Sequence, residues 1–419
     1  MKLSSPRLGI LTAALAVFSV ISCSENLDSS GVCAVLCPPV GGAVQNVTLD
    51  AVVFDTTVEA FSGLGSERVL LLASRGDTLD SRIVIRFDSI PAKYTQLGDT
   101  AKNITAVDSA YIRLQLDTLS IKGVQAVTIE AYDVDTTAND TSSAAILALF
   151  RPDRFISSQT FVRSELSDTL KYFISNAAVL ARAQNNLPLR IGLRATGSES
   201  AQLRFLSTES GIGPLLSFRV SPDTAIAKLV VSPYSRTPAS DLIAASSLAD
   251  YTVIAKSPPR GSIDELSVGG LPARRTYIRF DIPAGIIDSS TVVRATLLLD
   301  QIPNPALDPT DTVFLLPQLV VAGKAITDPT KAAQVLVDLS LDTLRLVPGG
   351  AGPREVELAR AFTIWRSQKA EDTPRALVLL SVSEGNSPLE IRFYSTEATA
   401  ALRPRLRISY TSRVPLGLP

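Results

Sequence analysis

The chain has 419 residues, of which 46% are hydrophobic and 19% are charged, and its formal net charge is −1. It contains no histidine, which excludes a Ser-His-Asp triad, a Cys-His dyad and any zinc site with histidine ligands. The near-zero net charge argues against nucleic-acid binding, because domains that bind nucleic acid normally carry a clear basic excess. Single cores rarely grow beyond about 250–300 residues, so the length predicts two or three domains.

Residues 1–22 have the features of a signal peptide. Lys2 and Arg7 make a positive n-region, and residues 8–21 form an apolar segment shorter than a membrane span of roughly 20 residues. The segment ends in Val-Ile-Ser-Cys at residues 20–23, which resembles a bacterial lipobox. This resemblance implies acylation of Cys23, export, and attachment to a cell-envelope membrane through the N-terminal acyl chains. Ser24 resembles the residue that sorts lipoproteins to the outer membrane; the alternative is an ordinary signal peptide with a chance cysteine.

Residues 23–46 are predicted to be a lipid-anchored flexible tether, because they are rich in Ser, Gly and Pro. The tether contains the two remaining cysteines, Cys33 and Cys37, and export to an oxidising compartment favours a disulfide between them. So short a loop contributes little stability. Two thiols without a histidine supply at most half of a zinc site, so neither a metal nor a cofactor is predicted.

An internal repeat of about 190 residues organises the rest of the chain. Residues 82–88 (RIVIRFD) recur at 275–281 (RTYIRFD), and residues 204–209 (RFLSTE) recur at 392–397 (RFYSTE). The segment 107–114 is echoed in the same way at 292–299. We therefore predict two copies of one domain, at residues 47–222 and 226–412, followed by a tail at residues 413–419.

The repeated segments have the periodicity of β-strands. Ile83, Ile85 and Phe87 alternate with other residues, the pattern of an antiparallel sheet with one buried and one solvated face. Arg86 and its counterpart Arg279 are therefore expected on the solvated face. Turn-rich segments separate further short apolar runs, as in a β-sandwich; these runs are at residues 127–134, 189–195, 252–255, 313–320 and 376–382. The predicted fold class is all-β, with two tandem antiparallel β-sandwiches of jelly-roll type.

Each copy also has one segment with helical spacing. Leu358, Phe362 and Trp365 fall at i, i+4 and i+7, and Leu170 and Ile174 begin the same pattern in the first copy. We expect a short helix in each sandwich. Trp365 is interpreted as a core residue of this helix rather than as an exposed platform for a sugar.

The order of these elements resembles the DNRLRE-type bacterial β-sandwich, which is similar to a carbohydrate-binding module family described for alginate-like polymers. The resemblance is carried by a strand ending in Arg-Phe-Asp, a strand of the type Ser-Ala-Tyr-Ile-Arg-Leu, and a closing Phe-x-Ser-Thr-Glu segment. It covers residues 48–222 and 226–412, although the first copy lacks the tryptophan. The resemblance implies a jelly-roll fold and a binding role, and it implies no catalytic residue.

Acidic residues at the ends of the repeated strands are the candidates for chemistry. A pair of carboxylates can hydrolyse a glycoside without histidine, but each of these residues recurs in both copies, where turns and loops use them for backbone hydrogen bonds. We therefore interpret them as structural; they are Asp88, Asp281, Glu209 and Glu397. The nearest approach to a calcium loop is made by Asp133, Asp135 and Asp140.

Arginines on the repeated strands are the candidates for binding. Planar guanidinium groups suit the carboxylates of an acidic polysaccharide, and the residues concerned are Arg86, Arg113, Arg279 and Arg294. The alternative is that they only solvate a sheet face. We expect a non-catalytic, lipid-anchored envelope protein whose two modules bind polysaccharide with avidity. The alternatives are a structural or adhesive lipoprotein that binds other envelope proteins and, third, a histidine-free glycan hydrolase or lyase.

Overall fold

The computed structural model describes residues 43–60, 65–95, 100–117, 125–136, 142–197, 201–221, 228–236, 248–257, 262, 264–338, 342–368 and 373–413. Acylation of Cys23 and the disulfide between Cys33 and Cys37 concern residues outside these ranges. The predicted tether overlaps the described chain only at residues 43–46, where the first strand begins at Gln45.

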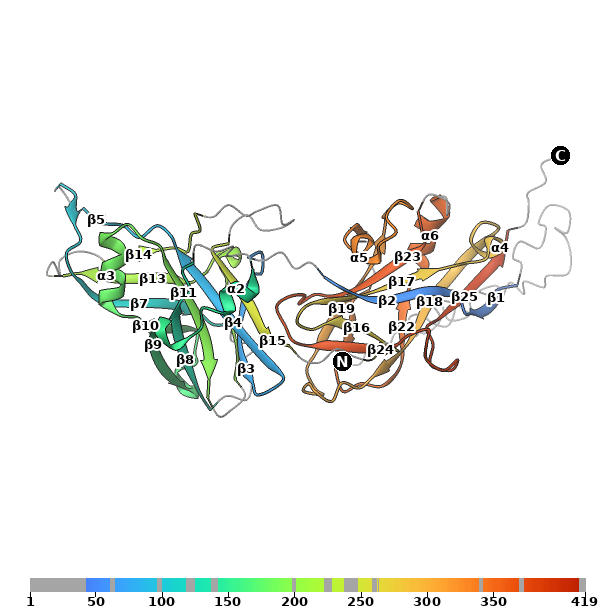
Figure 1. Ribbon diagram of the computed structural model, residues 1–419. Helices are drawn as coiled ribbons and strands as arrows, with labels where there is room; N and C mark the ends of the chain where they lie inside the picture. Colours follow the sequence, from blue (N-terminus) through green and yellow to red (C-terminus); the bar gives the residue numbers. More distant parts are fainter. Residues whose placement is uncertain are drawn as a thin grey trace, which may run out of the picture.

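The described chain is mostly antiparallel β-sheet and forms two β-sandwiches, which confirms the predicted all-β fold class (Figure 1). The strands of the first sandwich are β3 (Val69–Arg75), β4 (Leu79–Phe87), β7 (Val107–Gln115), β8 (Ala126–Asp133), β9 (Phe155–Val162), β10 (Thr169–Phe173), β11 (Leu189–Thr196), β12 (Ala201–Leu206), β13 (Leu215–Val220), β14 (Leu229–Val231) and β15 (Asp250–Lys256), with the small hairpin β5 (Lys93–Tyr94) and β6 (Lys102–Asn103). Its helices are α2 (Ser143–Leu147) and α3 (Asn176–Gln184), with the 3-10 turns η2 (Pro152–Arg154), η3 (Arg163–Glu165) and η4 (Thr208–Ser210).

The second sandwich has a matching set of elements. Its strands are β1 (Gln45–Leu49), β2 (Val52–Glu59), β16 (Glu265–Gly269), β17 (Arg274–Phe280), β18 (Ser290–Ile302), β19 (Val313–Val320), β20 (Leu336–Val337), β21 (Leu344–Leu346), β22 (Gly352–Glu357), β23 (Ala376–Ser381), β24 (Glu390–Tyr394) and β25 (Arg405–Ser412). Its helices are α4 (Ala284–Ile287), α5 (Pro329–Ala332) and α6 (Ala359–Ser367). Among the described helices, none is both long and apolar enough to cross a membrane.

Each sandwich buries its own apolar core. In the first, a sheet in the order β12-β3-β4-β11-β8-β9 and a second sheet in the order β10-β7-β13-β14 enclose residues such as Ile83, Ile112 and Phe205. In the second, one continuous sheet in the order β1-β25-β18-β24-β16-β17-β23-β19-β20 surrounds Phe393 and Trp365. Buried side chains alternate with exposed ones along the outer strands, which is why the period-2 pattern of the sequence located them.

Each sandwich contains the pair of strands that precedes the other sandwich in the sequence, and we call this arrangement the strand exchange. Strands β1 and β2 precede the first sandwich in the chain, yet β1 pairs with β25 and β2 pairs with β17 of the second sandwich. Reciprocally, β14 pairs with β13 and β15 pairs with β4 of the first sandwich. Figure 1 shows the blue strands β1 and β2 among the orange strands, and the yellow strand β15 beside β4. The first sandwich thus consists of residues 65–257, and the second of residues 43–60 with 264–413, which differs from the predicted boundaries of 47–222 and 226–412.

The exchanged strands make equivalent contacts, which explains why the repeat alone did not reveal the exchange. On β2, the Asp55 carboxylate accepts hydrogen bonds from the Thr396 amide at 2.9 Å and its hydroxyl at 2.7 Å. On β15, the Asp250 carboxylate accepts the same two bonds from Thr208, at 2.9 and 2.8 Å. Both exchanged strands carry this aspartate, so this contact does not specify which sandwich receives which strand.

Of the two predicted helices, the one in the second copy is confirmed, and the one in the first copy begins later than predicted. Helix α6 begins after Leu358, and it buries Phe362 and Trp365 as expected, with Trp365 only 1% exposed. In the first copy, however, Leu170 lies on strand β10 and helix α3 begins only at Asn176. The segment 169–173 alternates buried Leu170 and Tyr172 with exposed neighbours, a period of two that overrides the apparent helical spacing.

Candidate functional site

The four predicted binding arginines do not come together. Arg113 is exposed on β7 of the first sandwich, and Arg279 is exposed on β17 of the second. Arg294 is also exposed, on β18, but it pairs with Glu357. Arg86 has no exposed surface at all, which contradicts its predicted place on a solvated sheet face.

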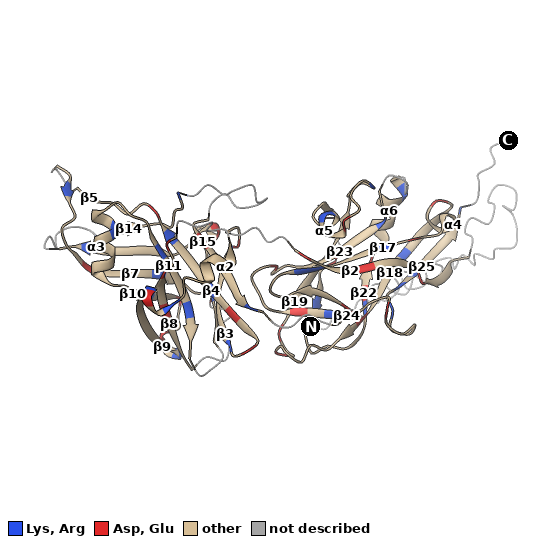
Figure 2. Ribbon diagram, viewed as in Figure 1, with Lys and Arg blue, Asp and Glu red and all other residues tan. Residues whose placement is uncertain are grey.

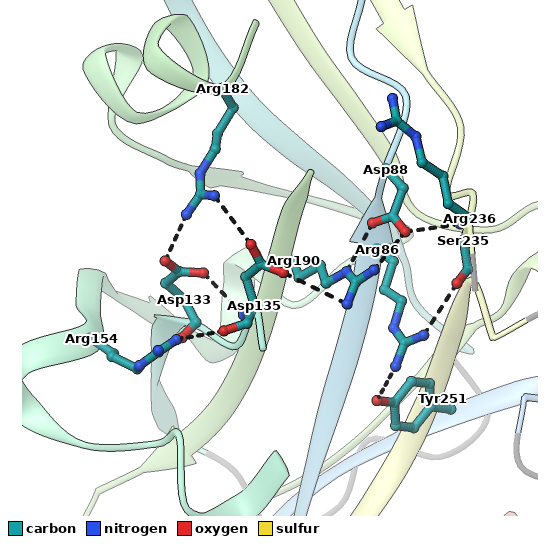
Figure 3. Close-up of polar contacts among 10 residues, drawn as sticks. All are labelled: Arg86, Asp88, Asp133, Asp135, Arg154, Arg182, Arg190, Ser235, Arg236 and Tyr251. Carbon is teal, nitrogen blue, oxygen red and sulfur yellow. Dashed lines mark hydrogen bonds and ion pairs between the residues drawn. The ribbon is translucent and has the colours of Figure 1, made fainter. Parts of the chain in front are cut away.

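Arg86 is buried because the connection between β14 and β15 covers it (Figure 3). It donates hydrogen bonds to the hydroxyls of Ser235 at 3.2 Å and Tyr251 at 2.9 Å, and its guanidinium lies 5.1 Å from the centre of the Tyr251 ring. The chain at Tyr234 forms backbone hydrogen bonds with both Arg86 and Asp88. Arg86 is therefore a structural residue of the first sandwich and not a ligand contact.

Asp88 belongs to the same buried polar cluster. Arg190 pairs with the Asp88 carboxylate through two hydrogen bonds of 3.0 and 2.9 Å, and the Arg236 amide donates a third of 2.9 Å. This bidentate pairing uses both carboxylate oxygens in a site that is 1% exposed. The geometry supports the structural interpretation of Asp88.

The candidate calcium ligands are paired with arginine instead. Arg182 of helix α3 lies 2.7 Å from the Asp133 carboxylate and 3.3 Å from that of Asp135 (Figure 3). Asp140 lies outside the described residues. Within the described ranges, no three Asp, Glu or Cys side chains form a cluster that could hold a metal ion. Arginine neutralises these carboxylates, as calcium would in a binding loop.

The outer face of the sheet β10-β7-β13-β14 has a different character. We call it the basic-aromatic face, and its residues are Tyr111, Arg113, Lys171, Phe173 and Lys228. The register of β10 and β7 places Phe173 beside Tyr111 and Lys171 beside Arg113. Phe173 is 53% exposed, and its ring centre lies 5.8 Å from that of Tyr111. The exposed Phe173 ring and three cations thus share one surface, and the Tyr111 ring beside them is only 8% exposed.

The cations of this face are oriented around Tyr111. Lys228 donates a hydrogen bond to the Tyr111 hydroxyl, and the ammonium groups of Lys228 and Lys171 lie 4.9 and 5.7 Å from the ring centre. The hydrogen bond from Lys228, followed by the positive charges of Lys228 and Lys171, lowers the pKa of Tyr111. Neither lysine, nor Arg113, forms an ion pair with a described carboxylate. The face therefore presents a net positive charge to solvent.

The equivalent face of the second sandwich is neutralised. Strand β22 pairs with β18 there as β10 pairs with β7 in the first, and it carries Glu355 and Glu357 where β10 carries Lys171 and Phe173. Glu355 lies 2.8 Å from Arg407, and Arg294 lies 3.2 Å from Glu357. Figure 2 shows acidic and basic residues interspersed over both sandwiches. Only in the first sandwich does this described sheet face combine unpaired cations with an exposed ring, that of Phe173.

Sequence reasoning found one member of the basic-aromatic face, Arg113, and missed the others. The helical spacing predicts Lys171 and Phe173 in a helix, and the predicted boundaries place Lys228 in the second domain, at residues 226–412, and not in the first. The alternation of exposed Lys171 and Phe173 with buried Leu170 and Tyr172 was the signal that marks this surface.

Comparisons with known proteins show no family for this chain. No protein-family model matches it, and no curated protein matches it. Among solved structures, T=1 particles derived from infectious bursal virus align with 11% identity and a TM-score of 0.12, over 91% of this chain and 79% of that one. The infectious bursal disease virus Gx strain aligns with 11% identity and a TM-score of 0.13, over 93% and 84% of the two chains.

Proposed function

We propose that this protein is a non-catalytic, lipid-anchored protein of the cell envelope that binds acidic polysaccharide through the basic-aromatic face of its first sandwich. The observation that carries the proposal is the exposed ring of Phe173 beside cations that have no described carboxylate partner. Carboxylates of a polymer form charge-assisted hydrogen bonds with guanidinium and ammonium groups. The exposed Phe173 ring supplies apolar contact area for a sugar ring of the polymer.

The sequence supports the location and the ligand class. The lipobox at residues 20–23 favours attachment through Cys23, with the outer membrane as the expected site. The resemblance to DNRLRE-type modules favours a jelly-roll fold and a polymer ligand.

Affinity electrophoresis tests the proposal directly. The purified mature chain is run in native gels that contain polygalacturonate, an acidic polymer, or dextran, a neutral one. We expect polygalacturonate alone to retard the protein, and the retardation to weaken as ionic strength rises because exposed charges are screened. Equal mobility in the acidic, neutral and empty gels would contradict the proposal.

Two variants locate the binding surface. Lys171→Glu introduces at β10 the type of residue that β22 carries at Glu355, and we expect about tenfold weaker binding to polygalacturonate, corresponding to about 1.4 kcal/mol. The matched control is Arg294→Ser on the neutralised face, which we expect to leave the affinity unchanged. An effect of Arg294→Ser as large as that of Lys171→Glu would refute the assignment to the first sandwich.

A further inference from the structure

A pocket of about 270 Å³ opens on the second sandwich beside Arg279. We call it the Arg279 pocket; its lining includes Phe54, Tyr277, Arg279, Lys324 and Ile326. It lies on β17, and the basic-aromatic face belongs to the other sandwich. The two surfaces are therefore independent.

The strand exchange builds this pocket. Phe54 reaches it on β2, from the N-terminal segment, and the register of β2 and β17 pairs Phe54 with Arg279. The Arg279 guanidinium lies 5.4 Å from the centre of the Phe54 ring, and Tyr277 meets that ring edge-on at 6.1 Å. A guanidinium held over a ring keeps its N–H edge available for a planar anion.

The lining of the pocket is cationic and partly apolar. Arg279 and Lys324 contribute two positive charges, and no described carboxylate lines the pocket or pairs with either of them. Phe54 is 38% exposed and Ile326 is 37% exposed, so apolar surface lies beside the cations. This combination favours a ligand that has both a carboxylate and an apolar ring face.

The first sandwich closes the equivalent position. Arg86 occupies on β4 the place that Arg279 occupies on β17, but the long connection between β14 and β15 covers Arg86. In the second sandwich, only residues 50 and 51 connect β1 with β2, and they are too few to cover Arg279. The difference in the length of one connection thus leaves one arginine buried and the other at an open pocket.

We propose that the Arg279 pocket binds a single carboxylate-bearing sugar ring, such as a uronate monomer or the terminal uronate of an acidic chain. Arg279 pairs with the carboxylate, Lys324 adds a second positive charge, and the C–H face of the sugar packs on Phe54 and Ile326. The volume lies just below the range of roughly 300–1,000 Å³ typical for drug-sized ligands, which suits one ring. This inference rests on the proposed function for its ligand class, acidic sugars, but it uses a separate surface and a shorter ligand.

Titration of the full mature chain with galacturonate tests the inference, with galactose as the neutral probe and acetate as the carboxylate without a ring. Isothermal calorimetry is expected to show saturable binding of galacturonate, at least tenfold weaker binding of acetate, and no binding of galactose. We expect Arg279→Ser and Lys324→Ser each to weaken galacturonate binding at least tenfold. Circular dichroism checks that both variants remain folded.

The control variant is Lys171→Glu, which we expect to leave galacturonate binding unchanged. Unaltered binding in Arg279→Ser, or equal affinity for acetate and galacturonate, would overturn the inference. If galacturonate does not bind but polygalacturonate still retards the protein in a way that depends on Lys171, the pocket assignment fails and the proposed function stands. Loss of both signals refutes both.

Discussion

Arg86 and Arg279 occupy the same position of the repeat and have opposite surroundings. Arg86 is enclosed by Ser235 and Tyr251, which accept its hydrogen bonds, and by the backbone at Tyr234. Arg279 contacts the Phe54 ring and is otherwise open to solvent. A single residue type therefore stabilises the fold in one sandwich and lines a pocket in the other.

Substitution of each arginine by serine tests the structural role of Arg86 against the pocket-lining role of Arg279. We expect Arg86→Ser to lower the free energy of unfolding by about 2–4 kcal/mol, because it leaves a cavity and removes the partner of two buried hydroxyls. Arg279→Ser is expected to change it by less than about 0.5 kcal/mol, as exposed substitutions usually do. Urea denaturation followed by circular dichroism measures both; equal destabilisation would contradict the assigned burial of Arg86.

A half-buried carboxyl group, Glu67, and a buried one, Asp250, lie in the first sandwich. Burial raises the pKa of Glu67 to about 7, although the Gly65 amide donates to its carboxylate. Burial likewise raises the pKa of Asp250 to about 6, and the hydrogen bonds from Thr208 only partly offset this. The folded state therefore holds these two protons more tightly than the unfolded state does.

This difference sets the direction of a pH effect. Because the folded pKa of each group is raised, its stabilising contribution is complete below about pH 4 and is lost as pH rises towards 7. Each contribution is on the order of 3 kcal/mol. Glu67→Gln replaces the titrating carboxyl group by a neutral amide. We therefore expect the free energy of unfolding of this variant to exceed that of the wild type by more at pH 8 than at pH 5. The exposed control Asp77→Asn should show no such gain; a wild-type-like pH profile in Glu67→Gln would contradict the raised pKa.

At the scale of elements, one strand of each sandwich determines the charge of the outer sheet face. This strand is β10 in the first sandwich and β22 in the second. Strand β10 presents Lys171 and Phe173, and strand β22 presents Glu355 and Glu357 at the corresponding register. Strand β22 buries Val356 between these glutamates, as β10 buries Tyr172 between its outer residues, because the pleat separates the inner and outer sets. Glu357 also accepts hydrogen bonds from the Leu358 and Ala359 amides at the start of α6, so Glu355 is the outer residue that can be exchanged without loss of a backbone contact.

Exchange of the outer residue Glu355 is expected to transfer binding. The variant Glu355→Lys places a cation on the second sandwich at the position that corresponds to Lys171 and releases Arg407 from its ion pair. We expect stronger retardation by polygalacturonate than for the wild type, because two faces on one chain bind the polymer with avidity. The control Glu355→Gln removes the negative charge alone and should give a smaller increase. Retardation no greater than that of the wild type would contradict the role of the face.

At the scale of the molecule, the strand exchange links the two sandwiches. The chain passes between them after β2 and again after β15, and each sandwich holds the strand pair that precedes the other in the sequence. The turn between β16 and β17 adds a contact, since Leu271 packs against Leu71, Ala73 and Leu79 of the first sandwich. The sequence repeat and the folding unit are therefore different segments of the chain.

Two fragments of the chain distinguish the folding unit, residues 65–257, from the first copy of the sequence repeat. We expect a fragment of residues 65–257 to unfold cooperatively, because it contains every strand of the first sandwich. A fragment of residues 65–222 lacks β14 and β15, which exposes the edge of β4 and leaves Thr208 without Asp250. It should lose the cooperative transition. Thermal unfolding followed by circular dichroism compares them, and equal transitions would contradict the need for the exchanged strands.

The sequence by itself determined the β class, the repeated strands, the two-copy repeat and the helix that buries Trp365, but it misassigned β10. These depend on local periodicity, and the alternation at Ile83, Ile85 and Phe87 or the spacing of Phe362 and Trp365 is enough to specify them. Periodicity also showed which residues face away from the core. It did not show whether that outer face meets solvent.

Only the tertiary structure decided which segments pair and what covers each outer face. Asp55 and Asp250 make the same hydrogen bonds, so this motif does not specify which sandwich each strand joins. Arg86 and Arg279 share a motif, yet a distant connection buries only the first. Burial and proximity arise from contacts between residues far apart in the chain, and the shared residues of a repeated motif do not differ between the copies before those contacts form.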